Sequence, residues 1–175
     1  KTPHLCERAL IHPPSYTAEL GDVTVSSFAT PHDSAASVGY TIEYMGYKIG
    51  FATDVGHVTD TVRDSLLGSN AVVLEFNHDV EMLVDGPYPD FLKRRILSDR
   101  GHLSNDAASE LAAYLAENGT NRFVLAHLSE QNNIPELAFA TALSALGDIE
   151  RLGIRLAVAE VDLPTMLVNF VRREE

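Results

Sequence analysis

Ile49-Gly50-Phe51-Ala52-Thr53-Asp54-Val55-Gly56 is the stretch of sequence most informative about the fold. Its first four residues are typical of a β-strand, and the polar turn that follows places the carboxylate of Asp54 at the end of that strand. A carboxylate has two oxygens, which suit a bridge between two cations roughly 3.5–4 Å apart. An aspartate that only forms a turn or caps the next helix is the alternative, and this loop alone leaves it open.

The segments on either side of this stretch predict an α/β fold. Upstream, three stretches are rich in β-forming residues, and Met45-Gly46 would join the last two as a tight hairpin. Downstream, helices with one apolar face alternate with short apolar strands, as in a layered sheet covered by helices. The expected strands are residues 23–28, 38–44, 47–53, 71–76, 122–126, 154–159 and 166–170, and the expected helices are residues 58–67, 104–117 and 135–151.

Two of these helices carry signals for their ends. One opens with Ser104-Asn105-Asp106, a plausible cap with an acid in the first turn, and closes at Asn118-Gly119. The other runs from Pro135 to about Arg151 with leucine and alanine on one face, and Gly153 ends it. The sequence contains no internal repeat and no low-complexity linker. We therefore expect residues 1–175 to form a single domain.

Composition limits the classes of protein that the chain can represent. Apolar residues make up 45% of the sequence, enough for a core without disulfides, and the one cysteine, Cys6, fits a reducing compartment. No stretch has the ~20 apolar residues of a membrane span, and no signal peptide pattern is present. We therefore expect a soluble, cytoplasmic protein without a membrane partner.

The charge balance argues against unspecific attraction to nucleic acid. Thirteen basic and 25 acidic side chains give a formal charge of -12. A polyanionic substrate would therefore need a bound metal or a local basic patch. Lys93-Arg94-Arg95 is the best such patch, and a solvated helix face is its alternative.

The opening of the chain resembles an interior stretch of a longer protein. The sequence starts at Lys1 rather than methionine, and residues 1–14 suggest a short helix fragment followed by a turn at Pro13-Pro14. Processing or a cleaved tag is the alternative.

Four loops at the expected strand ends carry a histidine or a carboxylate. An imidazole in such a loop can bind a metal through one neutral nitrogen while its second nitrogen bonds another acceptor. Each histidine taken alone is equally consistent with a structural role. The loops are Thr30–Ser34 with His32, Ala52–His57 with Asp54, Arg100–Asn105 with His102, and Ala126–Ser129 with His127.

Three further residues are candidates for binding substrate. His78 follows an apolar strand, and a residue in a surface loop is the alternative. Ser129 and Asn132 follow the last of the four loops, where they either face a substrate or hold the loop by turn hydrogen bonds. His102 precedes a helix N-terminus, where backbone N–H groups favour a phosphate or an oxyanion, which suits proton donation or substrate binding.

Four motifs, in this order and spacing, carry a resemblance to a known family. They are Phe51-Ala52-Thr53-Asp54-Val55-Gly56, Glu75-Phe76-Asn77-His78-Asp79, Gly101-His102-Leu103-Ser104-Asn105 and Ala126-His127-Leu128-Ser129-Glu130-Gln131-Asn132-Asn133. They resemble motifs of metallo-β-lactamase-fold hydrolases, most closely the YycJ/WalJ branch of bacterial proteins, and the last two are the specific ones. The resemblance implies an αββα sandwich with metals at one edge of the paired sheets, incomplete here at its N-terminus.

The resemblance also implies roles for individual residues. His32, Asp54 and His127 would bind metal, with Asp54 as the bridging and catalytic carboxylate. His102 would be catalytic and act near the leaving group. The family's His-x-His-x-Asp-His cluster, which supplies ligands to both metals, does not occur in the sequence. With Asp54 shared, each metal would have only two protein ligands from this chain.

For the complete protein, the resemblance implies a metal-dependent phosphodiester hydrolase, in particular a DNA exonuclease, with two divalent metal ions (Zn, Mn or Fe). Its partners would be DNA or another phosphodiester, and the missing N-terminal segment, in cis or as a separate piece. Two alternatives stay open. One is a hydrolase of the same fold that acts on a small phosphodiester, lactone or thioester, and the other is a non-catalytic structural or partner-binding half-domain.

Overall fold

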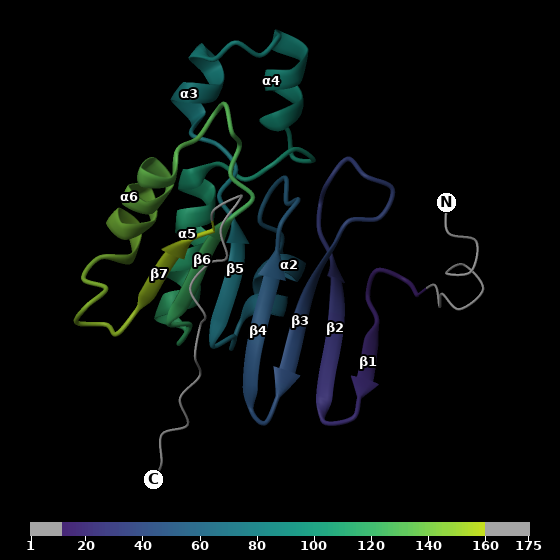
Figure 1. Ribbon diagram of the computed structural model, residues 1–175. Helices are drawn as coiled ribbons and strands as arrows, with labels where there is room; N and C mark the ends of the chain where they lie inside the picture. The colour runs from purple at the N-terminus through teal and green to yellow at the C-terminus, as the bar shows by residue number, and fades with distance from the viewer. Residues whose placement is uncertain (1–11, 160–175) are drawn as a thin grey trace.

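The computed structural model describes residues 12–159, which form one seven-stranded sheet and five helices (Figure 1). The strands lie in chain order across the sheet. The first three pairs of neighbours are antiparallel and the last three are parallel. The strands are β1 (Thr17–Leu20), β2 (Val23–Ala29), β3 (Val38–Tyr44), β4 (Tyr47–Ala52), β5 (Ala71–Glu75), β6 (Arg122–Ala126) and β7 (Arg155–Val158).

The change from antiparallel to parallel pairing at β4 follows from the connections. Before β4 the strands are joined by turns and a short loop, whereas each later crossover contains helices, as parallel neighbours require. The predicted hairpin is confirmed: Tyr44 pairs with Tyr47, and Met45 and Gly46 have φ of 48° and 79°. The edge strand β1 was not predicted, because its largely exposed residues lack an apolar alternation.

The helices are α2 (Asp60–Leu66), α3 (Val80–Asp85), α4 (Asp90–Ile96), α5 (Asn105–Glu117) and α6 (Pro135–Leu146). Thr59 caps α2, since its side chain accepts a hydrogen bond from the backbone of Val62. The carboxylate of Asp54 is therefore not the cap of this helix, and the capping form of that alternative is excluded. α5 begins and ends as predicted, with Ser104 as its cap and Asn118 at its end.

The predicted helix from Pro135 to Arg151 is too long. α6 ends at Leu146, because Gly147 adopts φ of 72° and breaks the run of helical residues. Turns follow, and Gly153, with φ of 67°, lies in the turn before β7 instead of ending the helix. The strand expected at residues 166–170 and most of the helix fragment expected at residues 1–14 lie outside the described residues.

The hydrophobic core lies between the sheet and α2, α5 and α6. Alternate residues of β5 and β6 point to this side and are buried, whereas Val73 and Val124, which point to the other face, are only partly buried. Gly50 lets β4 approach α2, because a Cβ at this position would collide with the side chain of Leu66. The core residues include Val72, Leu74, Phe123 and Leu125 from the sheet and Leu66, Leu111, Leu115 and Ala142 from the helices.

Residues 12–159 thus confirm the predicted α/β class as one sheet with helices, and this part of the chain forms no second sheet. None of the helices described here is long and apolar enough to cross a membrane. α3 and α4 stand beyond the carboxyl ends of β4, β5 and β6 (Figure 1). The loops that leave these three strands therefore meet beneath α3 and α4.

Candidate metal centre

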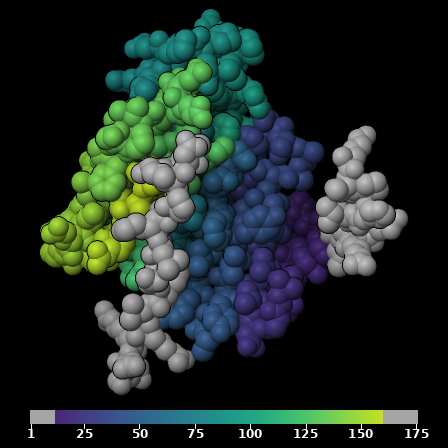
Figure 2. Space-filling view, in the orientation of Figure 1, coloured from purple at the N-terminus to yellow at the C-terminus, as the bar shows by residue number. Residues whose placement is uncertain are grey.

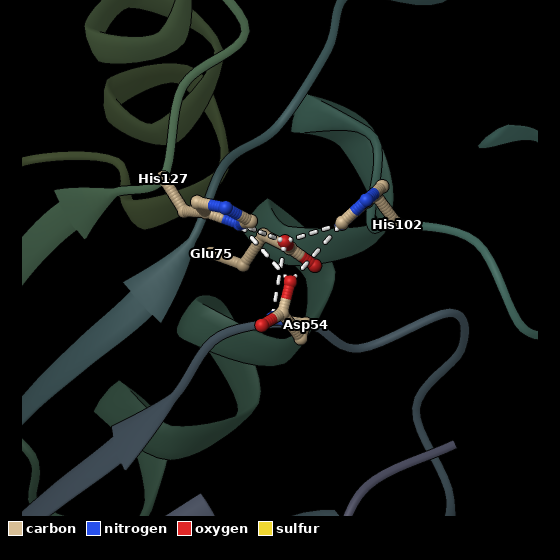
Figure 3. Close-up of side chains that lie close together, drawn as sticks. All are labelled: Asp54, Glu75, His102 and His127. Atoms are coloured by element: carbon tan, nitrogen blue, oxygen red, sulfur yellow. Dashed lines mark hydrogen bonds and ion pairs between the residues drawn. The ribbon is translucent and has the colours of Figure 1, made fainter. Parts of the chain in front are cut away.

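Three acidic or imidazole side chains gather at the carboxyl ends of the parallel strands. Glu75 is the last residue of β5, Asp54 follows β4, and His127 follows β6. Because β4, β5 and β6 are parallel neighbours, their carboxyl ends lie at one edge of the sheet. The three side chains converge there with His102, from the loop before α5 (Figure 3).

Asp54 and His127 both have a left-handed backbone, with φ of 55° and 59°. Such a conformation is unusual for residues other than glycine and costs on the order of 1 kcal/mol or more. It persists here because neighbouring groups hold each loop: the backbone N–H of Asp54 donates to Glu75 Oε1 at 3.2 Å, and Asn77 Nδ2 donates to the carbonyl of His127 at 3.0 Å. The strained turns direct both side chains toward the same point.

Glu75 organises the cluster from beneath. Its side chain is fully buried, and its two oxygens accept five hydrogen bonds. Two of them come from imidazoles: Nδ1 of His102 at 2.9 Å and Nδ1 of His127 at 2.6 Å. The other three come from the backbone N–H groups of Asp54, Val55 and Leu103.

These hydrogen bonds decide the ionisation of Glu75. Burial alone would raise its pKa, but the hydrogen bonds from His102 and His127 outweigh burial and lower the pKa to about 2. The ionised carboxylate can only accept hydrogen bonds, so Nδ1 of each histidine carries the proton. A neutral ring held in this way has its lone pair on Nε2, and metal-binding histidines commonly donate their other nitrogen to a supporting carboxylate.

Asp54 lies at the centre of the group. One carboxylate oxygen, Oδ1, is 3.7 Å from His127 Nδ1 and 3.8 Å from His102 Nδ1. The hydrogen bond that His127 donates to Glu75 raises the pKa of His127; burial opposes this, and the nearby charges of Glu75 and Asp54 add to it. A second negative charge beside a buried carboxylate favours any cation placed between them.

His32 also lies near Asp54. Its Nε2 is 3.7 Å from Asp54 Oδ1, and its Nδ1 lies 2.9 Å from the carbonyl of Gly101. A carbonyl only accepts, so Nδ1 is the donor, and a neutral ring in this orientation has its lone pair on Nε2. Gly101 itself packs against the end of α4, where a Cβ would collide with the carbonyl of Ile96.

Two arginines hold the loop that carries His32. The guanidinium of Arg100 donates to the carbonyl of His32 from Nε and Nη2, at 3.1 and 3.0 Å. Arg95 forms a bidentate ion pair with Asp33, and its hydrogen bond lowers the pKa of that carboxyl to about 2. The loop is therefore anchored at two successive residues.

These side chains fit a divalent cation. Ligand atoms of Asp54, Glu75, His102 and His127 all lie within 4.8 Å of one another. Imidazole nitrogen and carboxylate oxygen suit Zn, Mn or Fe. A cavity of about 470 Å³ opens over the cluster and is also bordered by Tyr88, Leu92 and Arg95. The structure thus brings together all four residues predicted to bind metal or act in catalysis: His32, Asp54, His102 and His127.

The predicted substrate-binding residues occupy different positions. Ser129 borders the same cavity, and its hydroxyl accepts hydrogen bonds from the backbone and side-chain amides of Asn132 at 3.2 and 3.3 Å. Asn132 is fully buried, and its hydrogen bonds to Ser129 hold the turn, while its contact with substrate stays a prediction. Substrate contact through Ser129 stays a prediction.

His78 is not a surface residue, so the surface-loop alternative is wrong. It is 1% exposed and borders a second cavity, of about 490 Å³, which His102 also lines. Neither ring nitrogen has a hydrogen-bond partner within residues 12–159, and burial lowers its pKa to about 4. His78 is therefore neutral, and its proposed contact with substrate stays a prediction.

Sequence reasoning missed the role of Glu75. The signal was present, because an acidic residue that ends an apolar strand is expected to be buried with partners. Asn77, two residues later, was missed as well. Its hydrogen bond to the carbonyl of His127 depends on a contact between residues 50 positions apart, which no local pattern reveals.

Comparison with known proteins places the chain in a family. The family model described as "Beta-lactamase superfamily domain" matches residues 5–128. The chain is 45% identical over 118 residues to the exodeoxyribonuclease YycJ of Bacillus anthracis, covering 67% of this chain and 45% of that protein. It is 38% identical over 138 residues to the exodeoxyribonuclease WalJ of Streptococcus pneumoniae, covering 79% of this chain and 51% of that protein.

Solved structures agree on the fold. The metallo-β-lactamase fold protein YhfI of Bacillus subtilis matches with a TM-score of 0.62 at 14% identity, over 86% of this chain and 51% of that one. Zn²⁺-bound PqqB of Methylobacterium extorquens matches with a TM-score of 0.53 at 18% identity, over 90% and 55% of the two chains. This chain spans about half the length of the curated relatives that it matches. It belongs to the metallo-β-lactamase superfamily, in the branch of the YycJ and WalJ proteins.

Proposed function

We propose that the protein to which this chain belongs is a metal-dependent phosphodiester hydrolase acting as a DNA exonuclease, and that the cluster above Glu75 holds its divalent metal ions. The observation that carries the proposal is the pair of hydrogen bonds from Nδ1 of His102 and Nδ1 of His127 to one buried, ionised carboxylate, which fixes both rings beside Asp54. The names of the relatives in Bacillus anthracis and Streptococcus pneumoniae support DNA as the substrate. A cytoplasmic location, which gives access to bacterial DNA, is part of the same proposal.

Each residue of the cluster has a distinct task in this proposal. His32 and His127 would hold the cations, and Asp54, which lies within 3.7 Å of a ring nitrogen of both, would be shared between them. Bound divalent cations would supply the Lewis acidity that polarises a phosphoryl oxygen and lowers the pKa of water. His102 borders the cavity with its side chain 19% exposed, and Glu75 fixes its orientation. In its protonated form, with Nδ1 donating to Glu75, His102 would give the proton on Nε2 to the leaving oxygen.

Hydrolysis of end-labelled single-stranded DNA tests the proposal. The assay uses this chain and the longest natural polypeptide that contains it, each with its metal content measured. We expect stepwise release of mononucleotides by the longer polypeptide and weaker release by this chain. Asp54→Asn should lower the rate by about 100-fold or more, since removing a group that stabilises transition-state charge costs roughly that much.

The matched control is Asp22→Asn, which removes one exposed carboxylate in the turn between β1 and β2, far along the sheet from the cluster. It should leave the rate unchanged. Absence of DNA cleavage by the longer polypeptide would overturn the nuclease proposal. Cleavage of a small phosphodiester, lactone or thioester instead of DNA would identify the small-molecule hydrolase. DNA cleavage with two bound ions in the shorter chain would eliminate the half-domain.

A further inference from the structure

The outer face of α4 combines an exposed aromatic ring with cations. Phe91, Arg94 and Arg95 are spaced by three and four residues, so they share one side of the helix. Phe91 is 67% exposed, the side chain of Arg95 is 57% exposed, and Arg94 is also exposed. We call Phe91, Arg94 and Arg95 the α4 face.

The segment that carries the α4 face is positively charged, in contrast to the chain as a whole. Residues 91–98 contain three cations and no acid, whereas the chain as a whole carries a formal charge of -12. Of the nine lysines and arginines within residues 12–159, four lie between positions 93 and 100. The side chain of Arg94 makes no hydrogen bond or ion pair with the described residues 12–159. Its guanidinium is available to an anion from outside.

The α4 face also continues into the candidate metal centre. Arg95 borders the cavity over the cluster and ties α4 to Asp33, beside His32. Lys93 donates to the carbonyl of Val84, which fixes α4 against α3. Figure 2 shows α3 and α4, in teal, as the upper end of the molecule. A chain of phosphates that leaves the cluster on this side would pass over α4.

We propose that the α4 face binds the single-stranded end of a DNA substrate, with the ring of Phe91 stacked on an unpaired base and Arg94 on the phosphate of the same strand. This inference rests on the proposed function and specifies its substrate. An exposed aromatic ring beside cations is the arrangement that single-strand binding surfaces use, because every base offers a stacking face. A base within a duplex is already stacked on its neighbours, so Phe91 selects single strands.

Binding of a fluorescent oligodeoxythymidine with phosphorothioate linkages, which resist hydrolysis, tests the inference on the longest natural polypeptide. Phe91→Ala should weaken binding roughly tenfold, with little change in the salt dependence. Arg94→Ala should weaken binding several-fold and reduce the slope of log affinity against log salt by about 0.7, because one phosphate contact is lost. A duplex of the same length should bind more weakly and respond less to Phe91→Ala.

Matched controls remove similar groups far from α4. Leu152 is 53% exposed, and the side chain of Arg151 is 78% exposed. Leu152→Ala and Arg151→Ala should leave binding and its salt slope unchanged. Equal losses in the controls and the α4 variants, or binding that no α4 variant changes, would overturn the inference.

A hydrolysis assay separates this inference from the proposed function. The ratio of single-stranded DNA hydrolysis to hydrolysis of bis(p-nitrophenyl) phosphate should fall roughly tenfold in Phe91→Ala, because only the longer substrate reaches α4. If the wild-type protein cleaves DNA and Phe91→Ala has the same ratio as the wild type, DNA binding by the α4 face is refuted and the nuclease proposal is not affected. If the protein binds the oligonucleotide through α4 but cleaves neither substrate, the nuclease proposal is refuted and DNA binding by the α4 face is supported.

Discussion

Glu75 accepts a hydrogen bond from Nδ1 of His127 at 2.6 Å, from a position with no exposed surface. Glu75 ends β5 and His127 directly follows the parallel neighbour β6, so the sheet itself sets their separation. A supporting carboxylate of this kind fixes the orientation of an imidazole and increases its basicity toward a metal. The stability of the protein and its affinity for metal should therefore depend on the same buried charge.

Replacing Glu75 by glutamine should damage both properties. Glutamine keeps the shape of the side chain, but its neutral amide cannot accept five hydrogen bonds from both oxygens, so buried donors lose their partners. We expect a loss of about 3–5 kcal/mol in the free energy of unfolding. The affinity for divalent cations should fall by about 10- to 100-fold. Urea unfolding and metal titration measure the two effects, and Glu117→Gln, at the exposed end of α5, is the control.

His78 should make the protein sensitive to mild acid. Burial lowers its pKa from 6.5 to about 4, so between these values the unfolded chain binds a proton that the folded protein does not. The free energy of unfolding should therefore fall as the pH drops from about 6.5 to about 4, by roughly 3 kcal/mol, and this contribution should level off below the folded pKa.

His78→Leu removes the titrating group and should flatten stability over that pH range. Urea unfolding at several pH values provides the measurement. His57→Leu, a substitution at an exposed histidine, should keep the wild-type slope. An identical slope in wild type and His78→Leu would show that some other group titrates.

Arg95 should act on metal binding through the loop of His32. Arg95→Ala removes the bidentate pair with Asp33 and frees the residue next to His32. We expect the metal dissociation constant to rise by about tenfold. Arg95→Lys should have an affinity between those of the wild type and Arg95→Ala, because an ammonium cannot form the bidentate ion pair with Asp33. Arg151→Ala should have no effect, and full recovery with lysine would show that charge alone matters.

The backbone at Asp54 should distinguish asparagine from alanine. The left-handed φ of 55° is tolerated by asparagine more readily than by alanine. Asp54→Asn should therefore be more stable than Asp54→Ala by about 1 kcal/mol, although both lose the carboxylate. Thermal unfolding of the two variants without metal measures the difference. Equal stabilities would mean that the loop relaxes around alanine.

The sequence predicted the elements whose signals are local. The hairpin at Met45-Gly46 and the ends of α5 are set by turn and cap residues within a few positions. α3 and α4 have six and seven residues, too few for an apolar period to show, so no range was predicted for either. α6 ends at Gly147, whereas the sequence pattern predicted its end at Gly153. A glycine marks a possible helix end, but the sequence does not show which of two glycines ends the helix.

The site was predictable only where a residue follows a strand. Asp54 and His127 each come just after an apolar strand, and the order of parallel strands then brings them together. Glu75 was missed because its function depends on hydrogen-bond donors from three separate loops, up to 52 positions away in the chain. Its burial is a tertiary property, and the buried charge became interpretable only with those donors in place.

Calorimetric titration of Zn²⁺ or Mn²⁺ into the chelator-treated protein tests most directly whether the cluster above Glu75 is a metal centre. We expect saturable binding by the longest natural polypeptide, greatly weakened by Asp54→Asn and unchanged by Asp22→Asn. Imidazole signals of His32 and His127 in NMR spectra should shift in the same titration. Binding of equal strength in wild type and Asp54→Asn, or no saturable binding by the wild type, would contradict a metal centre at this site.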